Sequence, residues 1–238
     1  MATSPTYLEL ADRLEREFDH RRPGDRVASE HALAAEHRVS RPTARAALQE
    51  LERRYLVRRV RGAGTFVNDR VTYCIGSSYP PSFSQTVRAA GATPHWSIVQ
   101  SRHEPARGAV AADLALAPGA DVIVLNRIGW IDDDIACFST SYLPADVTQG
   151  LDTEVDSSGS LYETLRSYYG LQPQRRWSRA SLELPDETTA EWLDLRQRAP
   201  MWLVEGVNVC TRLHRPIEKV RSWMRTDVVQ VRFELGAP

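Results

Sequence analysis

The sequence of 238 residues predicts an α+β fold divided into two domains of modest size. Residues 1–68 contain three helical patterns followed by two short β-prone runs, whereas the rest of the chain mixes strand and helix patterns. A stretch that ends in Ser-Ser-Tyr-Pro-Pro-Ser separates the two parts, and its adjacent prolines make it stiff. We therefore expect domains at 1–68 and 82–238, joined by a linker at 69–81.

Three helices are expected in the first domain, and each begins at a recognisable cap. Thr6 and Glu9 form a capping-box pattern, and apolar residues then recur at helical spacing until the Pro-Gly pair at 23–24. Ser29 and Ser40 are the expected N-caps of the second and third helices.

A hairpin follows the third helix. Two β-prone runs, 56–60 and 65–67, flank the tetrapeptide Arg61-Gly62-Ala63-Gly64, and glycines between such runs are typical of hairpin loops. Helix, helix, short turn, helix and hairpin is the order of a winged helix-turn-helix.

The second domain is expected to combine a sheet with flanking helices. The strand candidates are 95–101, 121–131, 135–143, 174–184, 201–210 and 216–233, the last with a break near Thr226-Asp227. The helix candidates are 83–90, 106–116, 160–169 and 186–196. Asp132-Asp133-Asp134 joins two strands and is interpreted as a hairpin turn; a metal cluster is disfavoured because no histidine or further carboxylate lies nearby in sequence.

Composition favours a cytoplasmic protein. No apolar run approaches the ~20 residues that span a bilayer, and the N-terminus lacks the basic and apolar regions of a secretion signal. The three cysteines are widely spaced, which fits a reducing compartment. No membrane association and no cofactor are expected.

The third helix presents a polar stripe opposite its apolar face. At about 100° per residue, Arg41, Arg45 and Gln49 lie within about 80° of one another, whereas the alanines and leucines of this helix point away from them. Arginine can bind guanine, and glutamine adenine, with two hydrogen bonds in the major groove. Residues 38–61 also contain eight arginines and two glutamates, a net charge of +6 that attracts phosphates.

This pattern predicts a surface that binds double-stranded operator DNA; an arginine-rich surface helix without a ligand is the alternative. The helix N-termini and the hairpin tip add further contacts. The residues expected from the pattern are Ser29, Ser40, Arg41, Thr43, Arg45, Gln49, Arg61, Gly62 and Gly64.

Residues 28–67 resemble the DNA-binding domain of the GntR family, whose pattern is roughly P-S-E-R-x-L-A, V-S-R-x-T-V-R and G-x-G-T-F-V. The resemblance implies DNA contacts at Arg41, Thr43, Arg45 and the wing tip from Gly62 to Thr65. His31 stands where the family usually has arginine, so one contact is expected to be weaker or pH-dependent. Ala28 replaces the usual proline.

Residues 82–236 resemble the UTRA effector-binding domain of the HutC subgroup. The motifs are Gly91-Ala-Thr-Pro94, Leu116-Ala-Pro-Gly119, Val124-Leu-Asn-Arg127, Ser141-Tyr-Leu-Pro144, Ser160-Leu-Tyr162 and Arg215-Pro-Ile-Glu218. The resemblance implies a chorismate-lyase-like antiparallel sheet with flanking helices. Within the subgroup, the sequence looks most like regulators of phosphonate uptake and breakdown.

Anion chemistry suggests where an effector binds. Ser82 to Gln85 and Ser160 to Glu163 are capping-box patterns, and helix N-termini bind phosphate-like groups, although simple helix capping explains each pattern equally. Arg127 lies in an apolar strand and needs either a ligand anion or an internal carboxylate as partner.

The resemblance implies that the ligand site is lined by Ser84, Arg127, Ser160, Tyr162 and Glu218. The subgroup often has a second arginine two residues after the first, but Gly129 stands there, which makes a sugar phosphate a less suitable ligand. We expect Arg179 to supply the missing cation.

The expected function is a ligand-responsive transcriptional regulator, a homodimeric repressor released from its operator by a phosphate, phosphonate or phosphorylated metabolite. The alternatives are an enzyme with a chorismate-lyase-like domain tethered to DNA, and a regulator of amino-acid or amino-sugar catabolism. An architectural DNA-binding protein is disfavoured because it would not need so large a second domain. No catalytic nucleophile–base pair and no metal-ligand spacing are found, so an enzyme is not expected.

Overall fold

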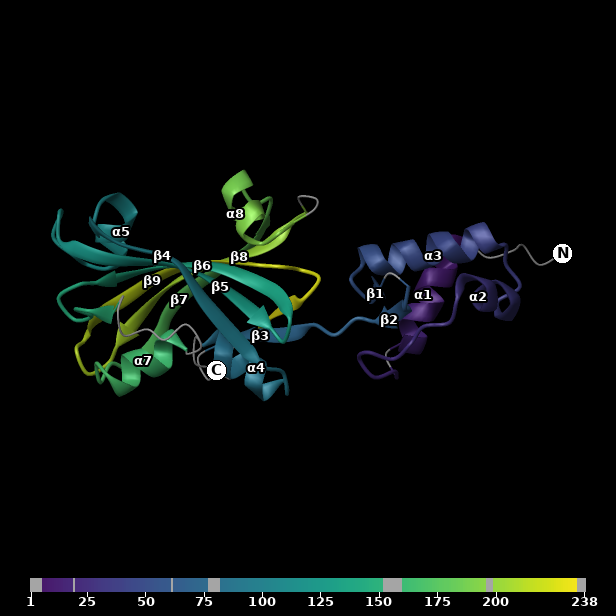
Figure 1. Ribbon diagram of the computed structural model, residues 1–238, viewed down its shortest axis with the longest axis horizontal. Coiled ribbons are helices and arrows are strands. Elements are labelled where there is room, and N and C mark those ends of the chain that lie inside the picture. Colours follow the sequence, from purple (N-terminus) through teal and green to yellow (C-terminus); the bar gives the residue numbers. More distant parts are fainter. Residues whose placement is uncertain are drawn as a thin grey trace. The chain divides into compact units, whose positions relative to one another are not determined.

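Figure 1 shows the computed structural model, which describes residues 6–18, 20–60, 62–76, 82–151, 160–195 and 199–234. The chain divides into two compact units, Met1–Arg70 and Val71–Pro238. Each unit has its own hydrophobic core.

The first unit consists of three helices and a two-stranded hairpin: α1 (Tyr7–Phe18), α2 (Glu30–Glu36), α3 (Arg41–Arg53), β1 (Val57–Val60) and β2 (Gly64–Val67). Thr6 and Glu9 form the expected capping box, since each backbone N–H bonds the other side chain. Ser29 and Ser40 each accept the N–H three residues on, at 3.2 Å. The winged helix-turn-helix prediction is confirmed.

Helix α3 packs its apolar face against α1 and α2. Its buried residues include Ala44, Ala47, Leu48 and Leu51, each at most 1% exposed. This burial leaves the polar stripe of α3 on the surface.

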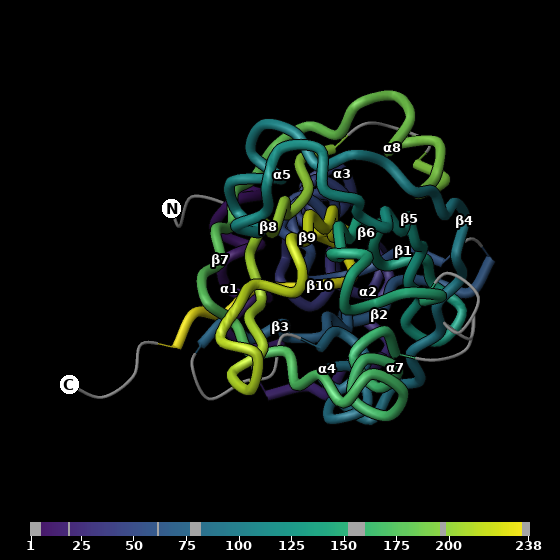
Figure 2. Tube along the Cα trace, turned by 90° about the vertical axis from the view of Figure 1, so that its left-hand side faces the viewer, coloured from purple at the N-terminus to yellow at the C-terminus, as the bar shows by residue number. Residues whose placement is uncertain are grey.

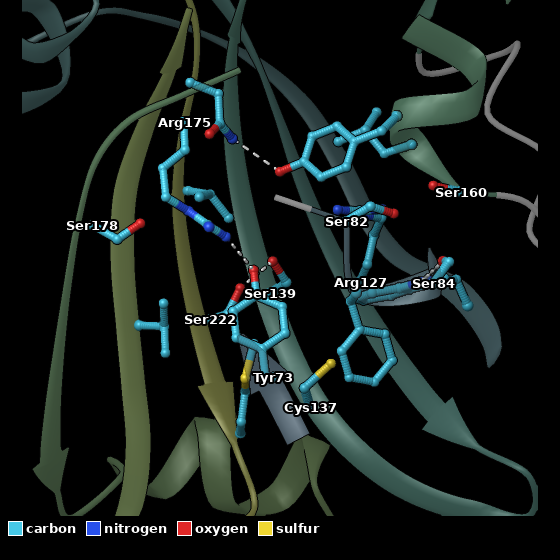
Figure 3. Close-up of a pocket in the computed structure, with 18 of the residues that line it drawn as sticks. Tyr73, Ser82, Ser84, Arg127, Cys137, Ser139, Ser160, Arg175, Ser178 and Ser222 are labelled. Atoms are coloured by element: carbon cyan, nitrogen blue, oxygen red, sulfur yellow. Dashed lines mark hydrogen bonds between the residues drawn. The ribbon is translucent and has the colours of Figure 1, made fainter. Parts of the chain in front are cut away.

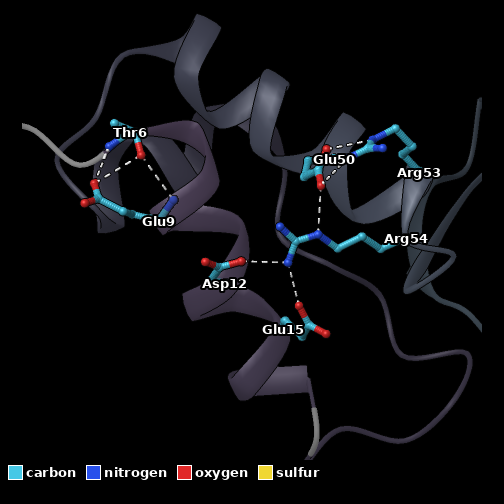
Figure 4. A network of polar contacts seen from close by, with 7 residues as sticks. All are labelled: Thr6, Glu9, Asp12, Glu15, Glu50, Arg53 and Arg54. Carbon is cyan, nitrogen blue, oxygen red and sulfur yellow. Dashed lines mark hydrogen bonds and ion pairs between the residues drawn. The ribbon is translucent and has the colours of Figure 1, made fainter.

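An ion-pair network joins α1 to α3 (Figure 4). Arg54 donates to Glu50 at 2.8 Å and to Asp12 and Glu15 at 2.7 Å each. Arg53 bonds both oxygens of Glu50, which is 7% exposed. Bonds from Arg54 and then Arg53 lower the pKa of Glu50, against the opposing effect of burial. The carboxylate is therefore charged in the folded state.

The second unit is built on a six-stranded antiparallel sheet with the order β4-β5-β6-β9-β8-β7. The strands are β4 (Pro94–Pro105), β5 (Asp121–Ile131), β6 (Asp134–Pro144), β7 (Pro173–Glu183), β8 (Met201–Cys210) and β9 (Arg215–Met224). Each coincides with a predicted strand. The expected break after β9 is also present, because residues 225–228 separate it from β10 (Val229–Phe233).

Helices cover both faces of this sheet. Figure 1 shows α4 (Phe83–Ala89) and α7 (Leu161–Ser167) on one face, and α5 (Gly108–Asp113) and α8 (Glu187–Trp192) on the other. The view turned by 90° in Figure 2 shows the same separation. Helices α4 and α7 lie side by side, since Arg88 and Glu163 form an ion pair at 2.6 Å. The α+β prediction, with an antiparallel sheet and flanking helices, is confirmed.

Strand β3 (Val71–Ile75) differs from the expectation, because it lies inside the range predicted as a linker. It pairs in parallel with β10, with Val71 opposite Val229. Val71, Tyr73, Cys74 and Ile75 are buried and Thr72 is half-buried, so this strand is packed into the second unit. The second unit therefore begins directly after Arg70. Pro80 and Pro81 lie outside the described residues.

The aspartate run forms the β5–β6 hairpin turn, as expected. Asp132 has a φ of 51° and accepts the N–H of Thr93 at 2.9 Å. Within the described ranges, no three histidine, cysteine or acidic side chains are placed to hold a metal ion. None of the helices in that part of the chain is long and apolar enough to cross a membrane.

Candidate functional site

The predicted DNA-reading stripe is exposed on α3. Arg41, Arg45 and Gln49 are all exposed, and Thr43 is half-buried behind them. Thr43 also shares a hydrogen bond of 2.7 Å with the hydroxyl of Ser40. The side chains that sequence placed on one helix face are thus accessible together.

Acidic residues orient two arginines of this surface. Arg45 donates through Nε to Glu30 at 3.1 Å, and its side chain remains 64% exposed. Arg59 pairs with Glu52 at 3.2 Å and lies 3.8 Å from Glu30. Glu30 lies at the start of α2 and therefore fixes the side chain of Arg45. Arg45 lies in the N-terminal half of α3, the part of the helix that reads base edges in this motif.

The wing is formed by β1, β2 and the turn between them. Gly62 has a φ of 79° and Gly64 a φ of 128°, conformations that other residues rarely adopt. A Cβ on Gly64 would lie 3.2 Å from Nε of Arg26, so the absence of a side chain there leaves room for the Arg26 guanidinium. Thr65 is half-buried, and its carbonyl accepts the N–H of Val27.

The remaining predicted DNA-contact residues are Ser29, His31, Ser40 and Arg61. Ser29 and Ser40 are exposed, and their hydroxyls cap α2 and α3. His31 is exposed on α2. Arg61 lies outside the described residues.

A pocket of about 590 Å³, part of it open to solvent, lies in the second unit between the sheet and the layer of α4, α7 and β3 (Figure 3). Two arginines and six serines are among the described residues that line it. The arginines are Arg127 and Arg175, and the serines are Ser82, Ser84, Ser139, Ser160, Ser178 and Ser222. One carboxylate, Glu205, also lines the pocket, and it forms an ion pair with Arg179. The arginines and hydroxyls can donate to an anionic ligand.

Strand register explains the polar floor of the pocket. Arg127 on β5 lies opposite Ser139 on β6, which lies opposite Ser222 on β9. The hydroxyls of Ser139 and Ser222 are 2.9 Å apart. In a second row, Glu218 lies opposite Asn208, which lies opposite Arg175 on β7.

Arg127 is buried with an incomplete set of partners. It is 5% exposed, and its Nε has no hydrogen-bond partner. One Nη donates to Ser141 at 3.4 Å, and the guanidinium lies 4.5 Å from the ring centre of Trp96. It forms no ion pair with a carboxylate of the described residues. Burial lowers its pKa, and Glu218 opposes this effect.

Glu218 is held behind the pocket. It is fully buried and accepts bonds of 2.7 Å from each of Ser141, Tyr162 and Asn208. Burial and then Glu218 raise the pKa of Tyr162, so its hydroxyl stays protonated and donates. Tyr162 lines the pocket, whereas Glu218 does not and supports it through Tyr162 and Asn208.

The three predicted serines at helix starts line the pocket, but they do not act alike. Ser82 accepts the N–H of Gln85 at 3.3 Å as the cap of α4. Ser84 accepts the indole N–H of Trp96 at 3.0 Å. Ser160 makes no side-chain cap bond, so the expected capping box does not form there and its hydroxyl remains available to a ligand.

The structure corrects the expectation for Arg179. This side chain is 72% exposed, pairs with Glu205 and does not line the pocket. Arg175, on the same strand, lines it instead. A β-bulge between Arg175 and Trp177 shifts the alternation of β7, so Arg175 and Ser178 share the pocket face.

Gly206 leaves room for this bulge and is the sequence feature that could have indicated it. A Cβ there would lie 2.6 Å from the carbonyl oxygen of Trp177 and 2.9 Å from the hydroxyl of Ser178. Glycine within a strand often marks a bulge or a close backbone approach.

The side chains of Trp96 and Cys137 occupy the space that a side chain at position 129 would need. A Cβ there would lie 2.7 Å from Sγ of Cys137 and 3.0 Å from the ring of Trp96. The ring of Trp96 also packs edge-on against Phe83. Burial raises the pKa of the Cys137 thiol to about 12, despite nearby Arg127. The pocket therefore contains a neutral thiol.

A winged helix-turn-helix combined with a domain that encloses a polar pocket defines a ligand-binding transcriptional regulator. Comparison with known families places the chain more narrowly. Residues 6–67 match the model of bacterial regulatory proteins of the gntR family, and residues 89–230 match the UTRA domain. The chain belongs to the GntR family and carries a UTRA domain.

Individual relatives agree with this assignment. The chain is 31% identical over 231 residues to the HTH-type transcriptional regulator GgaR of Escherichia coli, covering 94% of this chain and 89% of that protein. It is 31% identical over 215 residues to the HTH-type transcriptional repressor PhnF of Mycolicibacterium smegmatis, covering 90% and 86%. The crystal structure of PhnF from Mycobacterium smegmatis superposes with a TM-score of 0.68 at 28% identity, covering 96% of this chain and 100% of that one. The protein is a DNA-binding transcriptional regulator.

Proposed function

We propose that the protein is a homodimeric repressor that binds operator DNA in the cytoplasm and releases it when the pocket binds a small anion. The ligand class is inorganic phosphate, a phosphonate or a phosphorylated metabolite. The regulated genes serve uptake or breakdown of such compounds, a proposal supported by the sequence resemblance to regulators of phosphonate metabolism.

The observation that carries the proposal is the environment of Arg127. A guanidinium that is 5% exposed, with an unpartnered Nε and no carboxylate in ion-pair contact among the described residues, is costly to bury. An anion in the pocket would offset this cost with charge-assisted hydrogen bonds. The serine hydroxyls around it can donate further bonds to phosphoryl oxygens.

The proposed operator contacts rest on the exposed stripe of α3 and on the wing. Arg41, Arg45 and Gln49 would read base edges, whereas the α2 and α3 N-termini would bind phosphates. A single reading head offers few contacts, so a dimer on two half-sites provides the specificity that a genomic site requires.

Calorimetric titration of the full chain with inorganic phosphate, methylphosphonate and glucose 6-phosphate tests the pocket. We expect at least one of these anions to bind, and Arg127→Gln to weaken it about 10- to 100-fold, since a bond to a charged group contributes about 1.5–3 kcal/mol. The matched control is Arg176→Gln, which removes an exposed arginine of β7 that does not line the pocket and should bind as the wild type does. Equal binding by wild type and Arg127→Gln would refute the assignment.

A further inference from the structure

Arg175 has two neutral partners, and both belong to one short segment of the chain. Its Nη2 donates to the hydroxyl of Tyr73 at 3.2 Å, and its Nη1 donates to the carbonyl of Gly76 at 3.3 Å. Its guanidinium also lies 5.9 Å from the ring centre of Tyr73. Figure 3 shows the bond to Tyr73 within the pocket. Among the described residues, no carboxylate forms an ion pair with Arg175.

The segment that Arg175 holds follows the DNA-binding unit directly. The first unit ends at Arg70, and β3 begins at Val71, so Tyr73 is the third residue of the second unit. Strand β3 is not part of the six-stranded sheet and pairs with β10 alone. Arg175, on the edge strand β7, is therefore a side-chain link between the large sheet and this segment.

Tyr73 is suited to such a link. It is 6% exposed and lines the pocket together with Arg175. Burial raises the pKa of its hydroxyl, although Arg175 opposes this effect, so the group is neutral when Arg175 binds it. A bond from a cation to a neutral hydroxyl or carbonyl is weaker than a bond to an anion.

We propose that Arg175 is the second cation of the effector site and that a bound anion takes its guanidinium from Tyr73 and Gly76. This inference rests on the proposed function and adds a ligand-binding residue and a route of regulation. The anion then has different contacts in the two states of Arg175, which is what a ligand needs in order to shift an equilibrium. Release of Tyr73 and Gly76 removes the side-chain tie between the large sheet and the segment that continues into the DNA-binding unit, while β3 stays paired with β10.

The design separates anion binding from its effect on DNA. Four chains are compared: wild type, Tyr73→Phe, Arg175→Gln and Arg176→Gln. Tyr73→Phe keeps the ring but lacks the hydroxyl, whereas Arg176→Gln is the control, because Arg176 is the exposed neighbour on the same strand. Calorimetry gives the Kd for whichever of inorganic phosphate, methylphosphonate and glucose 6-phosphate binds the wild type most tightly. Fluorescence anisotropy gives the Kd for an operator fragment selected with the wild type, with and without that anion.

In the wild type, saturating anion should raise the operator Kd by about 5- to 150-fold, the usual range of such couplings. Tyr73→Phe should bind the anion at least as tightly as the wild type, because a partner that competes with the anion for Arg175 is lost. Its operator Kd should respond to the anion about threefold less or weaker still. Arg175→Gln should bind the anion at least about tenfold more weakly. Arg176→Gln should match the wild type in both measurements.

If Arg175→Gln binds the anion as tightly as the wild type does, Arg175 is not a ligand-binding residue. If the anion changes the operator Kd of Tyr73→Phe as much as that of the wild type, the proposed regulation through Tyr73 is wrong. Absence of any anion binding to the wild type would instead overturn the proposed function, and this inference with it. Thermal unfolding of each variant shows whether it is folded. If Arg175→Gln is unfolded, Arg175→Lys replaces it, with the same loss of affinity expected because lysine cannot bind two oxygens side by side.

Discussion

At the scale of single residues, Gly129 and Arg45 show how a local environment determines what a position can do. Gly129 has no room for a side chain, because Trp96 and Cys137 occupy the space that a Cβ would need. A family pattern with a second arginine at this position is therefore incompatible with this packing. The sequence showed that the charge is absent, but it could not show that an indole ring takes its place.

We expect Gly129→Ala to destabilise the second unit by about 1–3 kcal/mol, the usual cost of overpacking. The free energy of urea-induced unfolding, followed by tryptophan fluorescence, measures it. In a double-mutant cycle, Cys137→Ala should recover part of the loss, since it removes the closest contact, at 2.7 Å. An alanine at 129 that leaves stability unchanged would show that the ring and thiol move aside freely.

Arg45→Ala is expected to lower specific operator affinity by about 1–3 kcal/mol and to relax the preference at one base pair. The reason is its exposed position on α3, where Glu30 orients it. Binding-site selection with wild type and variant measures the preference. Arg59→Ala is the comparison: as a phosphate contact it should weaken binding to all sequences alike. An unchanged base preference in Arg45→Ala would contradict the reading contact.

At the scale of elements, the sequence-based prediction failed at β7, where it assumed that side chains alternate regularly between the two faces of the sheet. In a regular strand Arg175 and Arg179 share a face, so the pattern could not distinguish them as pocket residues. The bulge between Arg175 and Trp177 reverses the alternation, and it depends on a tertiary contact with Gly206 on β8. Elements with a clear local pattern were predicted well: α3 has one apolar face, and β5 is an almost continuous apolar run that is buried along most of its length.

We expect Gly206→Ala to weaken both folding and anion binding. Its Cβ would meet a backbone carbonyl at 2.6 Å, which cannot move without shifting the bulge that places Arg175 and Ser178. The expected loss of stability is about 1–3 kcal/mol. Urea unfolding and calorimetry with inorganic phosphate measure the two effects. Retention of wild-type values in both would show that the bulge does not depend on this glycine.

The α1–α3 network predicts a pH dependence of the first unit. The folded-state pKa of Glu50 is lowered, so its contribution is fully present above the unfolded-state pKa and is lost as pH falls through the folded-state value. Circular dichroism follows the helices of both units, whereas the six tryptophans all lie in the second unit and report on that unit alone, so helix loss without a fluorescence change reports on the first unit. Glu50→Gln should reduce the acid dependence of helix loss and leave the fluorescence transition unchanged. An identical acid profile for both proteins would contradict this.

At the scale of the whole molecule, the proposed recognition of a single genomic site requires two DNA-binding heads, because one head offers few contacts. We expect a homodimer on a pseudo-palindromic operator with half-sites about one helical turn apart. Footprinting on selected genomic fragments, with sedimentation to determine the mass of the complex, measures both features. A monomer bound to one asymmetric half-site would contradict it.

The central claim is that an anion bound at Arg127 releases the operator. The most direct measurement is fluorescence anisotropy of a labelled operator fragment during titration with the anion that binds the wild type most tightly. Chloride at equal ionic strength is the control, because salt alone weakens DNA binding. The wild type should release the fragment at concentrations where chloride does not, while Arg127→Gln should remain bound. Release of both proteins at the same anion concentration, or of neither, would contradict the claim.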